Sequence, residues 1–441
     1  MMTDDFRSLP IDAESAAQLK ERGLRFGLID SGDSSAFAQW ILAEGRGFHE
    51  PNPTDESLKE QVDGLADQRT TGVWDDTLGD RDTPVATVGS WPSELSVPGS
   101  ATIPAWAISA VTVSPTHRRR GIAKVLLESE LRAAHALGFP LAALTVSEST
   151  IYSRFGFAPA ALSADYSIDT RRAVWTGPTA SGRLQFVSPA SLREDGRALI
   201  ERMRPHLPGE VAMRDYKWER ILGMVGDREA ARSLRMVRYD DGDGTTQGLA
   251  VYKVTDTGPH HAAQVLDLQY LLATTSDAHA GLWSYLLQLD LVGTITATLR
   301  PVDEPLAWQL SDFRAVRKTD ERDHLWTRIL DPKVALVARR YATPGRIALQ
   351  VSDPLGFAEG RMLLDIDPKG TATVTPLSGE APADAAELGL TVNELSAAYL
   401  GATSWSTLVR TGRVEELREG SAAAADASFR TPTAPWLSFW F

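Results

Sequence analysis

A strand, an arginine-rich loop and a helix follow one another between residues 107 and 137, and this run constrains the fold most. Residues 107–113, Ala-Ile-Ser-Ala-Val-Thr-Val, predict a strand, and residues 122–137 carry apolar side chains at helical spacing. The loop between them ends in Arg-Arg-Arg-Gly at Gly121. Because the first N–H groups of a helix lack partners inside it, such a junction predicts an anion site suited to a pyrophosphate.

A second strand and an aromatic segment extend this unit to residue 157. Residues 141–146 are mostly apolar and predict a strand, and residues 151–157 read Ile-Tyr-Ser-Arg-Phe-Gly-Phe. The plain alternative is a solvated run of arginines beside a turn. A dinucleotide-binding unit is less favoured, because the loop lacks the three-glycine fingerprint. The order of strand, loop, helix and strand favours a phosphate-bearing ligand.

Charge and composition exclude several classes of function. Lys and Arg total 45 against 58 Asp and Glu, and this net charge of −13 disfavours nucleic acid and fits a cationic partner. The chain has no cysteine, so thiol nucleophiles and disulfides are excluded. We expect no metal, because His260 and His261 lack a third ligand nearby. Residues 1–10 do not resemble a secretory signal and no apolar run is long enough for a membrane span, so we expect a cytoplasmic protein that binds no membrane.

The length of 441 residues predicts two to four domains. A polar stretch at 64–83 predicts a long turn in the first part, and residues 177–182 have the composition of a linker. The second part alternates helix and strand patterns as the first does, at residues 192–203, 248–254, 264–272 and 281–291. A third part begins near Asp331, with predicted strands at 346–351, 361–366 and 371–376 and a capping box at Thr391 and Glu394.

The loop motif resembles that of a known enzyme superfamily. Arg118-x-x-Gly121-x-Ala123 resembles the acetyl-CoA loop of the GNAT acetyltransferases. With the 151–157 segment, the three-part layout and the aromatic end at 436–441, the chain resembles the enhanced-intracellular-survival (Eis) family of aminoglycoside N-acetyltransferases. That resemblance implies an α+β fold of tandem GNAT folds, each a mixed sheet flanked by helices, followed by a sterol-carrier-protein-like α/β domain.

The resemblance also implies domain boundaries and an assembly. The catalytic GNAT domain would span 1–178, a degenerate GNAT-like domain 183–330, and the sterol-carrier-protein-like domain 331–441. The loop that follows residues 264–272 has no arginine and no glycine before Gly281, so we expect one active site per chain. The family resemblance implies a homo-oligomer, a hexamer.

The resemblance assigns roles to particular residues. Tyr152 would be the proton donor, and the carboxylate of Phe441 would be the base. A buried aromatic with a satisfied hydroxyl is the plainer interpretation of Tyr152, and simple packing is the plainer one for the terminal aromatics. The residues implied to bind acetyl-CoA are Val111, Thr112, Val113, Arg119, Arg120, Gly121, Ile122, Ala123, Lys124, Ser147 and Glu148.

These features predict an acetyl-CoA-dependent N-acetyltransferase that acts on amines of polycationic small molecules such as aminoglycosides. The absence of cysteine excludes a thiol acyl-enzyme, so the amine would attack directly. Two alternatives stay open: a protein-lysine or polyamine acetyltransferase, and an apolar-ligand carrier acting through the third domain. An acidic and aromatic rim for the acceptor is expected from Glu44, Glu50, Asp55, Glu56 and Glu60 with Trp40 and Phe48.

Overall fold

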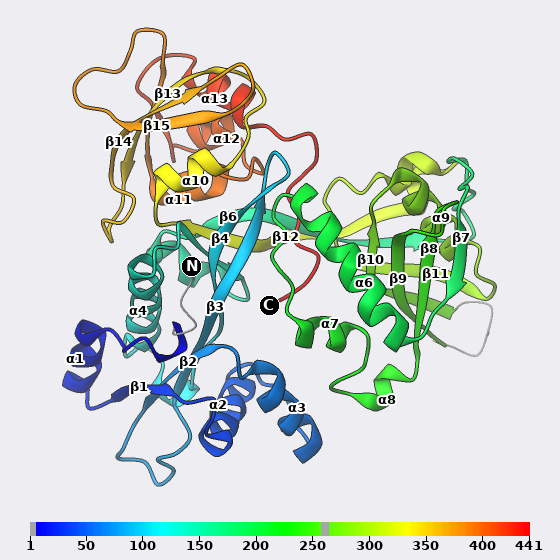
Figure 1. Cartoon of the computed structure of the whole chain (residues 1–441), viewed down its shortest axis with the longest axis horizontal. Helices are drawn as coiled ribbons and strands as arrows, with labels where there is room; N and C mark the ends of the chain where they lie inside the picture. The colour runs from blue at the N-terminus through cyan, green and yellow to red at the C-terminus, as the bar shows by residue number, and fades with distance from the viewer. Residues whose placement is uncertain (1–5, 257–263) are drawn as a thin grey trace. The chain divides into compact units, whose positions relative to one another are not determined.

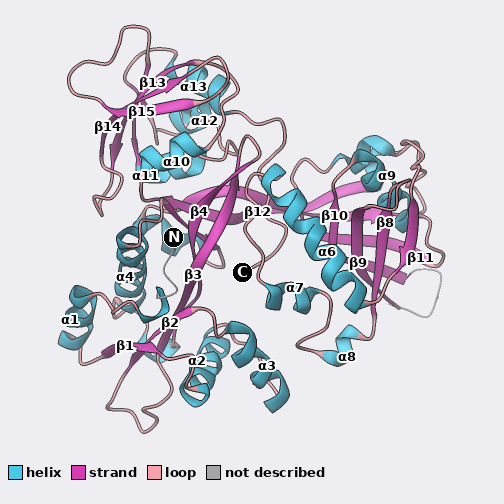
Figure 2. Ribbon diagram, viewed as in Figure 1, coloured by secondary structure: helices cyan, strands magenta, loops and turns pink. Residues whose placement is uncertain are grey.

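Two compact units make up the computed structural model, which describes residues 6–256 and 264–441 (Figure 1). Unit 1 comprises residues up to 160 together with 325–430 and Phe441, and unit 2 comprises 161–324 and 431–440. Both units mix helices and strands (Figure 2). His260 and His261 lie outside the described residues. The domain boundaries expected at 178, 183 and 330 stay predictions. The two units are defined by contacts between residues, whereas the expected domains are defined by sequence pattern and family resemblance.

The amino-terminal part of unit 1 is a mixed sheet in the strand order β1-β2-β3-β4-β5, with residues 325–329 of β12 added beside β5. Strands β1 to β4 pair antiparallel, and β4 pairs parallel with β5. Its elements are η1 (Phe6–Ser8), α1 (Ala13–Glu21), β1 (Arg25–Ile29), α2 (Ser34–Gly47), α3 (Asp55–Leu65), β2 (Arg69–Trp74), β3 (Ala86–Val97), β4 (Ala101–Val113), η2 (Pro115–His117), α4 (Ile122–Ala136), β5 (Leu141–Thr145), α5 (Ser149–Tyr152) and η3 (Ser153–Phe155).

Helices cover both faces of this sheet. On one face, α1 and α4 bury Leu19, Val125 and Leu126 against the strands. On the other face, α2 and α3 bury Trp40 and Val62. Figure 2 shows these two helix pairs on either side of strands β2 to β4. The predicted strand and helix that flank the arginine loop are confirmed as β4 and α4.

The predicted long turn at 64–83 is wrong over β2, which is a fully buried strand. The polar side chains of β2 are typical of a turn in the sequence, and the residues that they contact in the fold lie far away along the chain. Arg69 Nε lies 3.8 Å from Glu130 Oε1 with both side chains buried, and the Thr70 hydroxyl donates to the carbonyl of Ile29 at 3.2 Å. A buried polar side chain is tolerated where it is hydrogen-bonded, and hydropathy alone does not reveal that.

The carboxyl-terminal part of unit 1 is a second sheet in the order β15-β14-β13-β16-β17. The three strands predicted here are confirmed with small changes at their ends, and so is the capping box of Thr391 and Glu394. Its elements are α10 (Pro332–Ala338), β13 (Gly345–Ser352), β14 (Gly360–Ile366), β15 (Ala372–Pro376), β16 (Ala386–Thr391), α11 (Val392–Ala398), α12 (Trp405–Arg410), β17 (Glu415–Glu416) and α13 (Ser421–Phe429).

Unit 2 has its own sheet, in the order β6-β11-β10-β9-β8-β7, around a core that includes Trp283 and Tyr239. The helix predicted near Gly281 starts at Ser276, because the Thr275 side chain caps it there. Its elements are β6 (Ala158–Asp169, from residue 161 on), β7 (Arg183–Phe186), α6 (Pro189–Met203), η4 (Arg204–His206), α7 (Asp215–Ile221), α8 (Arg228–Ala231), β8 (Leu234–Asp240), β9 (Thr246–Thr255), β10 (Gln264–Ala273), α9 (Ser276–Leu287), β11 (Val292–Arg300), η6 (Pro305–Gln309), η7 (Phe313–Ala315) and β12 (Val316–Ile329, up to residue 324).

Candidate active site

Helix α4 starts at a backbone left open for an acceptor. Its N-cap is Gly121, in the left-handed conformation at φ 72°, and this residue has no side chain to accept from the first N–H groups. Arg119, two residues before it, also has a positive φ of 61°. The loop backbone and the positive end of the helix dipole therefore suit an anion, and a pyrophosphate fits this donor set.

A second arginine-bearing segment holds this loop. Arg22, just after α1, donates from Nη1 to the carbonyl of Arg120 at 3.0 Å, and Arg120 Nη2 donates to the carbonyl of Arg22 at 3.2 Å. A β-carbon on Gly121 would lie 2.7 Å from Arg22 Nη1, so only glycine lets the guanidinium approach this closely. Arg22 could not be predicted as part of this site, because nothing in its local sequence pattern connects it to Arg120, 98 positions away.

A buried carboxylate braces the other side of the loop. Asp75, directly after β2, lies 3.1 Å from His117 Nε2 and 3.6 Å from Arg120 Nη1. Hydrogen bonds from Thr77 and His117 hold the pKa of the Asp75 carboxyl well below its usual range. Asp75 is therefore ionised at neutral pH, and it fixes both the start and the middle of the arginine loop.

Strands β4 and β5 separate before they end. They pair only at Trp106 and Ala107, opposite Ala142 and Ala143, although β4 runs on to Val113. The backbone of the last part of β4 is therefore not paired with β5. An extended ligand can pair with such a strand edge as an added strand.

A bulge in β4 lies where the strands separate. Ala110 has φ 53°, and the register of β3 against β4 shifts between Thr87 and Gly89. Beyond the bulge, the hydroxyls of Thr112 and Thr87 lie 2.7 Å apart. The end of α2 packs directly on this strand, since a β-carbon on Gly47 would lie 2.4 Å from that of Thr112. The predicted residues Val111, Thr112 and Val113 thus form an irregular strand end beside α2.

Tyr152 lies at the end of α5 and is 5% exposed. Burial and the charge of Glu148 raise the pKa of its hydroxyl, a hydrogen bond with Ser147 lowers it, and the net result is a pKa of about 12. Its ring contacts Phe157 edge-on at 6.2 Å and Trp326 at 6.4 Å between centroids. Tyr152 therefore keeps its proton at neutral pH in a fixed aromatic environment.

Phe441 lies beside the end of β5. The Thr145 hydroxyl donates to its main-chain oxygen at 2.5 Å, and its ring contacts Trp91 edge-on at 5.8 Å. Thr145 and Trp91 are two site neighbours that sequence reasoning missed. The preceding residues are held within unit 2: the Trp436 indole donates to the carbonyl of Leu299, and His324 hydrogen-bonds to the carbonyl of Phe439.

Every predicted site residue belongs to unit 1. Arg118 Nη2 lies 4.0 Å from Glu148 Oε1, so the arginine loop reaches the segment after β5. Lys124 is exposed and lies 3.8 Å from Glu128. Arg119 makes no ion pair with any other described residue. The predicted site residues left exposed are Arg119, Arg120, Gly121, Lys124, Ser147 and Glu148.

The acidic side chains expected around the acceptor lie on or beside α2 and α3. Glu50, Asp55 and Glu56 are exposed, and Glu44 and Glu60 are half-buried. Within residues 6–256 and 264–441, no group of three His, Asp or Glu side chains could hold a metal ion. No helix in the same ranges is long and apolar enough to cross a membrane.

Family models match most of the chain. Residues 29–160 and residues 209–341 each match an acetyltransferase (GNAT) domain, and residues 332–438 match a sterol carrier protein domain. The predicted fold class, two GNAT folds followed by a sterol-carrier-protein-like domain, is confirmed.

Curated and solved relatives agree with these models. An uncharacterized N-acetyltransferase of Streptomyces avermitilis is 37% identical over 410 residues, which cover 90% of this chain and 95% of that protein. N-acetyltransferase Eis of Mycobacterium tuberculosis is 34% identical over 360 residues, 79% of this chain and 83% of that protein. The crystal structure of Eis1 from Mycobacterium abscessus matches 95% of this chain and 100% of its own, with a TM-score of 0.78 and 28% identity.

Proposed function

This chain belongs to the Eis family of GNAT N-acetyltransferases, and from that premise we propose that it acetylates amines of polycationic small molecules such as aminoglycosides. GNAT acetyltransferases use acetyl-CoA, which supplies the acetyl group as a reactive thioester. The observation that carries the proposal is the open start of α4 at Gly121, with three arginines beside it.

The residues of the loop and of β4 have the donors that a coenzyme A nucleotide needs. The N–H groups of Ile122, Ala123 and Lys124 would bind the diphosphate with Arg119 and Arg120. The edge of Val111 to Val113 that faces away from β3 is not paired with β5, and it would bind the pantetheine arm as an added strand. Ser147 and Glu148, after β5, would border the thioester end.

Tyr152 has the protonation state of a general acid. With a pKa raised to about 12, its deprotonation at pH 7 would cost roughly 7 kcal/mol, so it cannot serve as a base. It can donate its proton to the departing sulfur once the amine has attacked. The chain has no cysteine to carry an acyl group, which supports direct attack by the amine.

The acceptor amine must first lose a proton. A primary amine has a pKa of ~10.4, so its neutral form at pH 7 costs about 4.6 kcal/mol. We assign the proton-accepting role to the Phe441 carboxylate, whose main-chain oxygen already accepts from Thr145. The ring of Trp91 contacts the ring of Phe441, and a partly desolvated carboxylate at this position would be a stronger base.

A polycationic acceptor fits the charge of the chain. The net charge of −13 and the acidic side chains of α2 and α3 would attract an amine-rich molecule. A groove of about 820 Å³ in the third domain is lined by the charged residues Glu359, Arg361, Arg413 and Glu415 as well as by Val351, Leu390 and Val414. We also propose the hexameric assembly implied by the family, which light scattering on the purified chain would test.

The test is steady-state acetylation of a panel of aminoglycosides, followed by thiol release from acetyl-CoA. We expect turnover with at least one of them, and loss of most turnover when one residue is added after Phe441. Acetylation of lysine peptides without any aminoglycoside would favour a protein-lysine acetyltransferase. Full turnover of the extended chain would remove Phe441 from the mechanism.

A further inference from the structure

The turn that follows Tyr152 is held by side chains from a distant part of unit 1. Helix α5 has only four residues, and a helix this short is not stable on its own. The turn continues through η3 to Gly156, in the left-handed conformation at φ 87°. Tyr152 therefore depends on tertiary contacts for its position.

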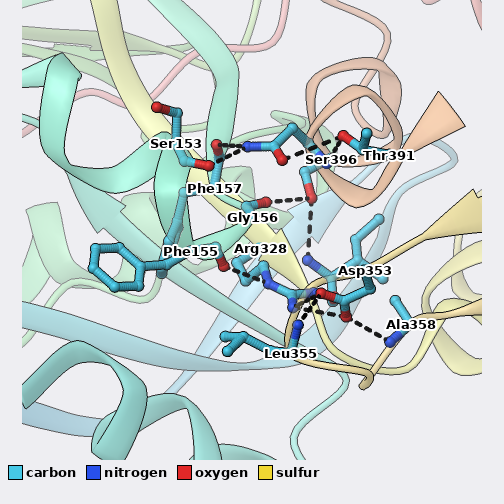
Figure 3. A network of polar contacts seen from close by, with 12 residues as sticks. Ser153, Phe155, Gly156, Phe157, Arg328, Asp353, Leu355, Ala358, Thr391 and Ser396 are labelled. Atoms are coloured by element: carbon cyan, nitrogen blue, oxygen red, sulfur yellow. Dashed lines mark hydrogen bonds and ion pairs between the residues drawn. The ribbon is translucent and has the colours of Figure 1, made fainter. Parts of the chain in front are cut away.

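Asn393, at the start of α11, supplies two of these contacts. Its Nδ2 donates to the carbonyl of Ser153 at 2.7 Å and to the carbonyl of Phe157 at 2.8 Å (Figure 3). Backbone carbonyls only accept hydrogen bonds, so only the NH2 end of the amide can face them. One side chain thus spans both ends of the turn, and Ser153 is the residue directly after Tyr152.

A buried ion pair holds the middle of the same turn. Arg328 Nε donates to the carbonyl of Phe155 at 2.8 Å, and its Nη2 lies 2.7 and 2.8 Å from the two carboxylate oxygens of Asp353. Both side chains are fully buried. A β-carbon on Gly156 would lie 2.8 Å from Val392 Cγ1, so the glycine lets α11 approach the turn.

The held residues are also the ones that contact Tyr152. Asn393 fixes the carbonyl of Phe157, and the ring of Phe157 contacts the ring of Tyr152. A displacement of this turn would therefore move the Tyr152 hydroxyl. A shift of about 1 Å in a catalytic group lowers turnover steeply.

We propose that Asn393 is a positioning residue for Tyr152, so that the sterol-carrier-protein-like domain braces the acid of the GNAT site. The proposal rests on the acid role assigned to Tyr152 above. It gives the third domain a task in catalysis that requires no ligand of its own. Thr391 supports the same contact, because its hydroxyl accepts from the backbone N–H of Asn393 at 3.3 Å.

The experiment is a double-mutant cycle on the full chain with the substitutions Asn393→Ala and Tyr152→Phe. We expect Asn393→Ala to lower kcat about 10-fold while the KM for acetyl-CoA changes less than twofold. In the Tyr152→Phe background the same change should lower kcat less than twofold, because no hydroxyl is left to position. Asn393→Asp keeps the shape of the side chain and loses both donors when ionised, so it should lower kcat at least as much.

Ser404→Ala is the matched control. Ser404 caps α12 in the same domain, so its loss should destabilise the domain by a similar amount and leave kcat unchanged. An equal loss of kcat with Ser404→Ala, full turnover of both Asn393 variants, or an additive cycle would overturn the positioning role. Full turnover of Tyr152→Phe alone would instead overturn the acid role, so the two failures are distinguishable.

Discussion

Helix α4 of unit 1 begins at a bare glycine, whereas helix α9 of unit 2 begins at a residue that caps it. Both helices follow a strand and precede a parallel neighbour of that strand. At α9 the Thr275 side chain accepts from the N–H of Ala278 at 3.0 Å, and Asp277 adds a carboxylate to the first turn. The donors that α4 leaves open are thus used at α9 by the chain itself.

The strands of the two units are similar at this point. In unit 2, β10 and β11 pair from Gln264 to Leu268 although β10 runs on to Ala273, and in unit 1 β4 and β5 pair at Trp106 and Ala107 although β4 runs on to Val113. The difference between the two units therefore lies at the start of the helix and not in the strand pairing. Gly281 of α9 lies inside the helix and packs on the ring of Tyr239, so it has a packing role. One architecture therefore becomes a binding site where its backbone groups are left without partners, and a structural support where they are satisfied.

The comparison predicts that changes in unit 1 alter rate and changes in unit 2 alter stability. The largest effect on rate should come from Tyr152→Phe. Loss of the hydroxyl removes the proposed proton donor, so we expect kcat to fall by roughly 10²-fold or more, as is usual for a general acid. Calorimetry should show a Kd for acetyl-CoA within twofold of the parent chain, and a tenfold weaker Kd would mean that the hydroxyl serves binding.

In unit 2 the largest effect on the free energy of unfolding should come from the buried carboxyl of Glu210. Glu210 accepts from the N–H of Ser438 at 2.9 Å, and burial raises its pKa to about 7. The folded state then holds a proton that the unfolded state releases between pH 4.5 and 7, so the free energy of unfolding should fall across that window by roughly 3 kcal/mol. Urea unfolding of Glu210→Gln should lack this fall, and an unchanged pH dependence would contradict the assignment.

A smaller effect on binding should follow from Asp75→Asn. The substitution keeps the shape of the brace but weakens its hold on Arg120 and His117, so the loop loses its fixed geometry. We expect the KM for acetyl-CoA to rise about 10-fold with kcat nearly unchanged, equivalent to about 1.4 kcal/mol. A change in kcat alone would show that Asp75 acts on the chemistry instead.

The smallest effect on stability should come from removing the side chain that caps α9 in unit 2. Thr275→Ala removes the side-chain acceptor at α9 and should lower the free energy of unfolding by about 1 kcal/mol. Acetylation should stay at the parent rate, because the loop that precedes α9 has no arginine to bind the cofactor. If this variant bound a second equivalent of acetyl-CoA, the start of α9 would also be a cofactor site, and the difference drawn between the two units would be wrong.

Local patterns in the sequence identify the elements that depend on local physics. The strand, loop and helix around Gly121 were predicted from the spacing of apolar residues and from the glycine at the helix start. The capping box was predicted from Thr391 and Glu394, which lie three residues apart. The contacts of Asp75 with His117 and Arg120 could not be predicted, and neither could those of Asn393 with Ser153 and Phe157, because these residues come together only in the folded chain. The start of α9 was predicted too late in the chain, because the prediction relied on the spacing of apolar residues and Thr275, which caps the helix, is polar.

The central claim is that the open start of α4 binds the diphosphate of coenzyme A. Titration calorimetry of acetyl-CoA into the chain and into Arg119→Glu tests it directly, with Arg171→Glu, an exposed arginine of unit 2, as the control. We expect one acetyl-CoA to bind per chain, with affinity at least tenfold weaker for Arg119→Glu and unchanged for Arg171→Glu. Equal affinity of Arg119→Glu and the parent chain would contradict it.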